Sequence, residues 1–167
     1  MFKIKYRYPV IILLAVYSYL NTLFSEVYFY YKISAPAWLI LTCLLLITAS
    51  VWESNRFLEK IISRFIKPAN SIKFLIVFFI SGFIAASVIS IAFIILADHI
   101  FLHQPLDTLT IAMKLSLTYA TRINLFMHIA NVIFVFFKKY KTKELEAEEL
   151  KRISAQAQLQ AIKNQVN

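Results

Sequence analysis

Polar side chains inside apolar stretches are the residues of this chain whose types could do chemistry. Thr121, Asn124, His128 and Asn131 recur at steps of three and four residues, which on a helix places them on one face. One interpretation is that this stripe holds helices together, since such groups bond between apolar helices at about 0.6–2 kcal/mol per contact. The other is that His128 senses pH, because imidazole titrates near neutral pH. The sequence leaves both interpretations open.

Two ionisable residues also lie in apolar surroundings, where a charge is costly and usually functional. Glu26 lies toward the end of the first apolar stretch, and Arg122 lies toward the beginning of the last one. If these stretches cross a membrane, both residues lie near its outer face. We expect them to form an ion pair that neutralises both charges. The alternative is that each side chain reaches the lipid headgroups alone.

A third candidate is the pair His99 and His103, which are four residues apart and flanked by Asp98 and Asp107. On a helix both imidazoles would share a face, as metal ligands do. A complete metal site needs more ligands, and Pro105 interrupts the helical spacing. We expect a plain polar loop and no resident metal, with these two histidines as weak metal candidates.

Motifs of soluble enzyme chemistry are missing from the sequence. It contains no Ser, His and Asp order of a hydrolase, no phosphate-binding glycine loop and no Cys-x-x-Cys pair. We therefore expect no catalytic residue and no cofactor bound by this chain itself. The net charge of +9 does not indicate nucleic acid, because the basic residues flank apolar runs instead of alternating with exposed aromatic residues.

The composition predicts an all-α membrane protein. The 167 residues are 60% hydrophobic, whereas soluble domains are about 45–50% apolar. A helix needs roughly 20 mostly apolar residues to cross a bilayer, and four stretches qualify: 9–31, 36–52, 72–97 and 109–137. Residues 1–137 are expected to form a four-helix transmembrane region, and residues 138–167 a cytoplasmic linker helix.

Basic residues orient the four spans. They cluster before the first span, between the second and third, and after the fourth: Lys3, Lys5, Arg7, Arg56, Lys60, Arg64, Lys67, Lys73, Lys138, Lys139, Lys141 and Lys143. The other side carries Lys32 between the first two spans and no Lys or Arg from Asp98 to Met113. Because short basic loops stay in the cytoplasm, both termini are expected to be cytoplasmic.

The segment 56–67, between the second and third spans, is amphipathic at helical spacing. It predicts a short helix that lies on the cytoplasmic leaflet, and Pro68 would end it. A helical extension of the second span is a nearly equivalent interpretation.

The tail that begins at Lys138 is charged, rich in Ala, Gln, Glu and Leu, and free of Gly and Pro, which favours a helix continuous with the fourth span. Its apolar positions predict a coiled-coil seam with two offset stripes: Leu145, Leu150, Ile153, Leu159, Ile162 and Val166. The offset favours a parallel homodimer with two packings of similar energy. The alternative is an amphipathic helix that packs on another domain.

The tail also carries a family resemblance. The run Lys143-Glu144-Leu145-Glu146-Ala147-Glu148-Glu149-Leu150-Lys151, followed by 157–167, is similar to the linker of LytS/YehU-type bacterial sensor histidine kinases. The runs 52–58 and 122–128 resemble the membrane region of such kinases, especially those of Bacteroidetes. In that family the linker leads into Pro-His-Phe-Leu-Phe-Asn, whose His accepts phosphate, and then into an ATP-binding domain.

The resemblance implies a membrane input region, in a bacterial inner membrane, that passes a signal to kinase domains. No residue of this chain matches the phosphoacceptor His, so ATP, Mg²⁺ and a response regulator are expected only for the domains that follow such a linker. Two other functions stay open. One is a membrane adaptor without catalysis that dimerises through the tail. The other is a small four-helix transporter with Glu26 as the coupling carboxylate, which the single glycine, Gly82, and the long charged tail disfavour.

Overall fold

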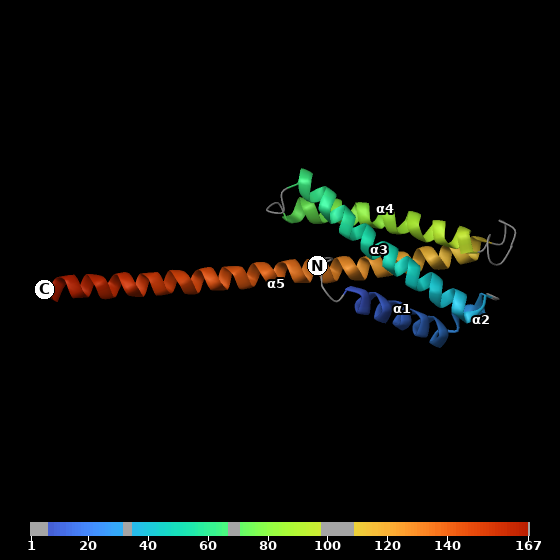
Figure 1. The fold of residues 1–167 in the computed structure, drawn as a ribbon, viewed down its shortest axis with the longest axis horizontal. Helices are drawn as coiled ribbons and strands as arrows, with labels where there is room; N and C mark the ends of the chain where they lie inside the picture. Colours follow the sequence, from blue (N-terminus) through green and yellow to red (C-terminus); the bar gives the residue numbers. More distant parts are fainter. Residues whose placement is uncertain (1–6, 32–34, 67–70, 98–108, 167) are drawn as a thin grey trace. The chain divides into compact units, whose positions relative to one another are not determined.

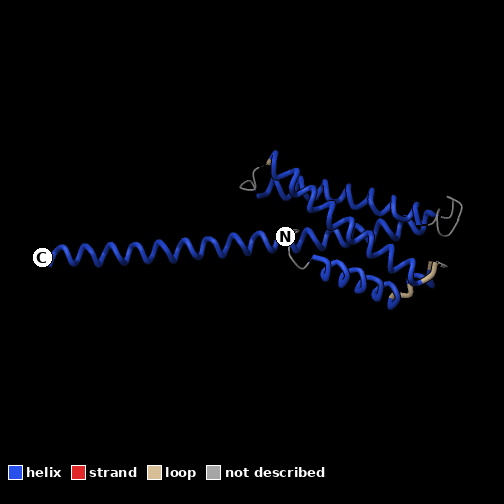
Figure 2. The backbone as a smooth tube through the Cα atoms, in the orientation of Figure 1, coloured by secondary structure: helices blue, strands red, loops and turns tan. Residues whose placement is uncertain are grey.

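The computed structural model describes residues 7–31, 35–66, 71–97 and 109–166, all but a few of them helical (Figure 2). Five helices are labelled in Figure 1: α1 (Arg7–Phe24), α2 (Val27–Tyr30), α3 (Ala37–Phe65), α4 (Ser71–Ala97) and α5 (Leu109–Val166). Within these ranges there is no strand. Four of the helices, α1, α3, α4 and α5, are long and apolar enough to cross a membrane. The predicted all-helical fold with four such helices is therefore confirmed.

The first expected span, residues 9–31, is not one helix. α1 ends at Phe24, and Glu26 adopts a left-handed conformation with φ of 50° before α2 begins. The turn brings the Thr22 hydroxyl within 2.9 Å of the Tyr28 hydroxyl. Residues six apart in a straight helix do not face each other, so this contact requires the break. Hydropathy alone does not reveal such a turn, because the residues on both sides are equally apolar.

The expected amphipathic helix, residues 56–67, is instead the last third of α3. α3 runs without interruption from Ala37 to Phe65, because the sequence offers no Gly or Pro between Pro36 and Pro68. On its amphipathic part Ile62 is buried, whereas Phe57 and Phe65 are exposed. The interpretation as an extension of the second span is the one that the structure supports.

α4 and α5 match the sequence analysis closely. α4 covers Ser71–Ala97 where 72–97 was expected, and α5 is a single helix through the expected fourth span and the tail. The chain divides into two compact units, Met1–Ile129 and Ala130–Asn167.

The first unit has its core where four helices meet. α3 packs against both α1 and α4 (Figure 1). The core side chains come from α1, α3, α4 and the first part of α5: Ile11, Leu14, Ile47, Val51, Trp52, Ile62, Phe78, Ala86, Ala120, Ile123 and Met127. Each of these helices thus contributes one buried stripe and leaves apolar side chains such as Ile12, Leu46 and Ile80 exposed.

The second unit consists of the remainder of α5. Asn131 is buried, but every side chain from Phe136 to Asn164 is exposed. Lys, Glu, Gln, Ala and Leu are strong helix formers, which explains how this segment is helical without a packed face. The seam residues Leu145, Leu150, Ile153, Leu159 and Ile162 are between 53% and 70% exposed. The side chain of Val166, the sixth seam residue, lies outside the described side chains.

Candidate functional site

The polar stripe of α5 enters the core of the first unit, where it forms the candidate site. Asn124 is 1% exposed and His128 is 4% exposed, while Thr121 is half-buried. Two residues from other helices complete this polar cluster, Asn55 on α3 and Gly82 on α4. We define the buried polar cluster as Asn55, Gly82, Asn124 and His128.

A hydrogen bond between two amides links α3 to α5 within the cluster. Asn55 Nδ2 donates to Asn124 Oδ1 at 2.8 Å and also lies 4.0 Å from the sulfur of Met127. Burying an amide without a partner is costly, so this bond favours one register of α5 against α3. The bond leaves Asn124 Nδ2 without a hydrogen-bond partner. This part of the stripe therefore acts between helices, as the packing interpretation expects.

His128 is held by aromatic rings instead of hydrogen bonds. Its ring centroid lies 4.6 Å from that of Phe78 and 5.4 Å from that of Phe79, both edge to face. Its Nε2 is buried and has no hydrogen-bond partner. Edge-to-face pairs add about 0.5–1.5 kcal/mol beyond burial for aromatic rings, so the two phenylalanines fix the plane of the imidazole.

Gly82 explains how α4 can approach this ring. A Cβ atom at this position would lie 2.5 Å from His128 Nε2 and 2.8 Å from Asn55 Oδ1, closer than real Cβ contacts. Only glycine allows α4 to lie this near to both side chains. Gly82 is the single glycine of the sequence, and a lone glycine inside a helical pattern is a signal of close packing. That signal, and the role of Asn55, were missed in the sequence analysis.

A second layer of hydrogen bonds ties α5 to its neighbours toward its first residues. The hydroxyls of Thr48 on α3 and Tyr119 on α5 are 2.5 Å apart, and Tyr119 also lies 3.4 Å from the carbonyl of Leu44. On the α4 side, the Ser116 hydroxyl donates to the carbonyl oxygen of Ser90 at 3.3 Å. The first part of α5 is therefore hydrogen-bonded to its neighbours in two places, at Ser116 and Tyr119 and again at Asn124.

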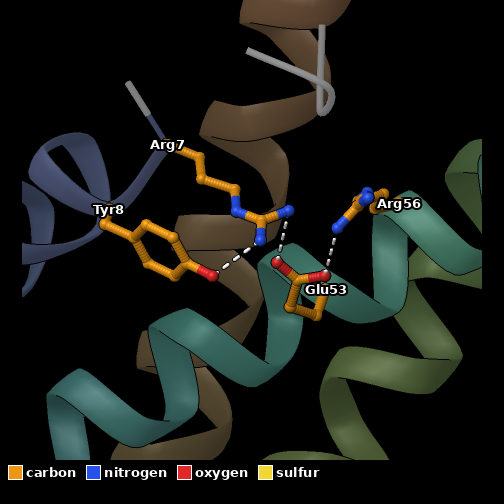
Figure 3. A network of polar contacts seen from close by, with 4 residues as sticks. All are labelled: Arg7, Tyr8, Glu53 and Arg56. Atoms are coloured by element: carbon orange, nitrogen blue, oxygen red, sulfur yellow. Dashed lines mark hydrogen bonds and ion pairs between the residues drawn. The ribbon is translucent and has the colours of Figure 1, made fainter. Parts of the chain in front are cut away.

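A charged network joins the first turn of α1 to α3 (Figure 3). Glu53 Oε1 lies 3.3 Å from Arg7 Nη1, and Glu53 Oε2 lies 3.1 Å from Arg56 Nη1. Arg7 also donates to the hydroxyl of Tyr8 at 2.6 Å, and its guanidinium carbon lies 4.6 Å from the Tyr8 ring centroid. From the sequence, Arg7 and Arg56 were expected only to orient the spans, not to form ion pairs. An acidic residue placed between two basic clusters is the signal that indicates this network.

Glu26 and Arg122 are not brought together. Both side chains are exposed, and among the described residues no ion pair joins them. Glu26 lies at the break between α1 and α2. Arg122 lines a groove together with Phe79 and Phe83. These two residues lie just before the midpoint of α4. Arg122 is therefore beside the middle of α4, not near its far end, and Glu26 has no interior position that suits a coupling carboxylate.

The remaining sequence candidates receive no structural test. His99 and His103 lie outside the described residues. Asn131 is buried, but it belongs to the second unit. Its Oδ1 has no hydrogen-bond partner.

Comparisons with known proteins do not assign a role to these residues. No protein-family model, no curated protein and no solved structure matches the chain. The roles of the buried polar cluster, the Glu53 network and α5 follow from their own contacts and chemistry.

Proposed function

We propose that this chain is the membrane-spanning input region of a two-component sensor histidine kinase, and that α5 carries the signal from the buried polar cluster to a cytoplasmic tail. The single observation that carries the proposal is the continuity of α5, which is one helix of 58 residues. A bilayer is crossed by roughly 20 helical residues, so most of α5 extends beyond the membrane. A rigid helix transmits a rotation or a shift at one end to the other.

The membrane setting is supported by side chains that water would not favour. The apolar window of α4 has a mean hydropathy of 2.6, and only 22% of it is buried inside the protein. Its exposed residues include Ile76, Ile80, Ile84 and Val88. Exposed apolar surface of this extent on four helices is typical of contact with lipid.

The orientation follows from the charges. If the four long helices cross the bilayer one after another, Arg7, Arg56 and Arg64 lie on the same side of the membrane as the lysines that begin the tail. In the proposal both termini and the Glu53 network therefore face the cytoplasm of a bacterial inner membrane. In this setting the two partners of Glu53 remain near water, which lowers the cost of the charges.

The tail supports the kinase assignment over a transporter. It leaves five apolar seam residues exposed, and such a stripe needs a partner surface to cover it. A second copy of the same helix supplies one by coiled-coil packing. The tail also resembles the linkers of LytS/YehU-type kinases. In this proposal the phosphoacceptor His, ATP, Mg²⁺ and the response regulator belong to domains that follow the linker.

Transmission along α5 is tested by changing the phase of the helix. The chain is joined through its tail to the phosphoacceptor and ATP-binding domains of a dimeric sensor kinase, and autophosphorylation is measured in membrane vesicles. Two residues or seven residues are inserted after Lys143. Two residues rotate the tail by about 200°, whereas seven return it to within about 20° of its starting phase.

The proposal expects the two-residue insertion to change autophosphorylation severalfold and the seven-residue insertion to retain most of the original level. Equal activity in both insertions, at equal amounts of inserted protein, would show that α5 does not transmit its phase. Such a result would favour the adaptor alternative.

A further inference from the structure

A groove between α4 and α5 carries two hydrogen-bond donors without a partner. It has a volume of about 230 Å³ and is lined by Phe79, Phe83, Thr121, Arg122, Asn124 and Leu125. The hydroxyl of Thr121 already donates to the carbonyl oxygen of Thr118 at 3.0 Å. Of the polar residues that line the groove, Arg122 and Asn124 are the ones with uncommitted donors, and the uncommitted donor of Asn124 is buried.

Arg122 presents a positive charge that nothing in the described part of the chain neutralises. Within the described residues Arg122 makes neither an ion pair nor a hydrogen bond, whereas Arg7 and Arg56 both contact Glu53. A cation at this level of a membrane helix is expensive and favours an anionic partner. Its guanidinium offers five donors in a fork that matches the two oxygens of a carboxylate.

The second donor is fixed by the buried polar cluster. Asn124 Oδ1 accepts the hydrogen bond from Asn55, so its Nδ2 is the atom left over. That nitrogen is buried without a hydrogen-bond partner on a residue that lines the groove. A buried amide donor costs free energy until an acceptor reaches it. The exposed Arg122 guanidinium and the buried Asn124 amide beneath the groove surface are both donors that bind an acceptor oxygen.

The rest of the groove is apolar and open. Phe79, Phe83 and Leu125 line it and remain 40%, 47% and 46% exposed. In the membrane setting these side chains face lipid, so a ligand reaches the groove from the bilayer. The volume is below the roughly 300–1,000 Å³ of a drug-sized site, which suits a headgroup and its first methylene groups.

We propose that this groove binds the carboxylate of a single-chain anionic amphiphile, a fatty acid, with Arg122 as the charge partner and Asn124 Nδ2 as a second donor. The acyl chain lies against Phe79, Phe83 and Leu125. A phospholipid fits less well because of depth. Phe79, the first groove residue on α4, is eight residues after Ser71, which is about 12 Å along the helix at 1.5 Å per residue. The phosphate of a phospholipid stays at the membrane interface and does not reach that level. The proposal rests on the proposed function in treating α4 and α5 as membrane spans.

The test measures binding of dodecanoic acid carrying ¹³C at its carboxyl carbon to the full chain in phosphatidylcholine nanodiscs. Carbon NMR distinguishes the carboxylate at the site from carboxylate in the lipid. Dodecanol serves as a competitor with the same chain and no charge, and sodium acetate as a competitor with the charge and no chain. The variants are Arg122→Gln, Arg122→Lys and the matched control Arg64→Gln, which removes the same charge from an exposed position on α3.

The expected result is saturable binding to the wild type that neither dodecanol nor acetate displaces at equal concentration. Arg122→Gln is expected to weaken binding at least ~10-fold, since a charge-assisted pair is lost. Arg122→Lys should be intermediate, because it keeps the charge but not the fork, and Arg64→Gln should bind as the wild type does.

Three results would overturn the proposal. Wild-type affinity in Arg122→Gln would exclude the charge partner, displacement by dodecanol would show a purely apolar groove, and displacement by acetate would show a site for soluble anions. If Arg122→Gln does not fold, as judged by circular dichroism, Arg122→Lys and the wild-type competition decide the outcome. Binding is measured without kinase output, so its failure leaves the phase-insertion test of the proposed function intact.

Discussion

The side chains of Asn55 on α3 and Asn124 on α5 share a hydrogen bond of 2.8 Å inside the core, next to the imidazole of His128. They are 69 residues apart in the sequence, so the bond forms only in the assembled bundle. Asn124 is on α5, the helix that continues into the exposed tail. Within the first unit the bond therefore holds the first part of α5 against α3.

We expect a double-mutant cycle at Asn55 and Asn124 to reveal this bond. Asn55→Ala and Asn124→Ala should each lower the free energy of unfolding by ~1–3 kcal/mol, because each leaves a buried amide without its partner. The double variant should lose less than the sum, with a coupling of about 0.6–2 kcal/mol. Equilibrium unfolding in mixed micelles, followed by circular dichroism, provides the measurement.

The control for this cycle is Ser87→Ala. The Ser87 hydroxyl is exposed and donates to the carbonyl oxygen of Phe83 within its own helix at 2.9 Å. Its removal should change stability by less than ~0.5 kcal/mol. A coupling of zero between Asn55 and Asn124 would show that the bond does not hold α3 and α5 together.

Gly82→Ala is predicted to disturb the buried polar cluster. The added Cβ would meet His128 Nε2 at 2.5 Å and Asn55 Oδ1 at 2.8 Å. Overpacking of this kind costs ~1–3 kcal/mol, and the better helix propensity of alanine offsets about 1 kcal/mol of that. We expect a net loss in the same mixed-micelle unfolding measurement, with a shifted NMR signal for His128.

The informative comparison is the same change in a second background. In His128→Ala the nearest obstacle is absent, so Gly82→Ala should cost less there than in the wild type. An equal cost in both backgrounds would mean that the ring of His128 is not what limits the approach of α4.

The sequence could predict those features that are determined by residues close together along the chain. α4 follows from an unbroken apolar run, and the continuity of α5 follows from strong helix formers on both sides of Lys138. The continuation of α3 past Trp52 was an available alternative, since no helix-breaking residue separates the span from the amphipathic segment. Such properties depend on residues a few positions apart.

The cluster could be predicted only in part. Spacing alone places Asn124 and His128 on one face of a helix, and both are buried. The approach of Asn55 and Gly82 depends on how three helices interdigitate, which periodicity does not encode. The neighbours of Arg122, Phe79 and Phe83, could not be predicted for the same reason, because the end of an apolar run in one helix does not fix which residues of another lie beside it.

Glu53→Gln is predicted to loosen the first turn of α1. It removes the charge that both Arg7 and Arg56 contact, at 3.3 Å and 3.1 Å. All three side chains are partly exposed, so the global loss should stay below about 1 kcal/mol. Amide hydrogen exchange of the first turn of α1 should be severalfold faster at low salt, with a smaller difference in concentrated salt. Glu146→Gln, in the exposed tail, is the matched control and should leave that turn unchanged.

The opposite result for Glu53 would also be clear. If exchange of the first turn of α1 is the same in Glu53→Gln and in Glu146→Gln, the network does not hold α1 against α3. The apolar contacts of Ile11 and Leu14 would then be what places this helix.

The seam of the tail is predicted to pair with the seam of a second copy. Single cysteines at Leu145, Leu150, Ile153, Leu159 and Ile162, in a Cys43→Ala background, should form disulfide-linked dimers in membranes under mild oxidation. Seam side chains of a parallel coiled coil face their equivalents, and a disulfide needs Cα atoms within about 7 Å. Cysteines at Lys151 and Gln160, which are also exposed in the single chain, are the controls and should crosslink at least severalfold less.

The pattern of crosslinks also tests the two offset stripes. Leu145, Leu159 and Ile162 belong to one stripe and Leu150 and Ile153 to the other, so a single fixed packing would favour one set. Comparable crosslinking in both sets, with Lys151 and Gln160 low, would mean that two packings coexist, as a stutter allows. A helix that packs on another domain would give no preference for the seam over the controls, and that outcome would exclude the homodimer.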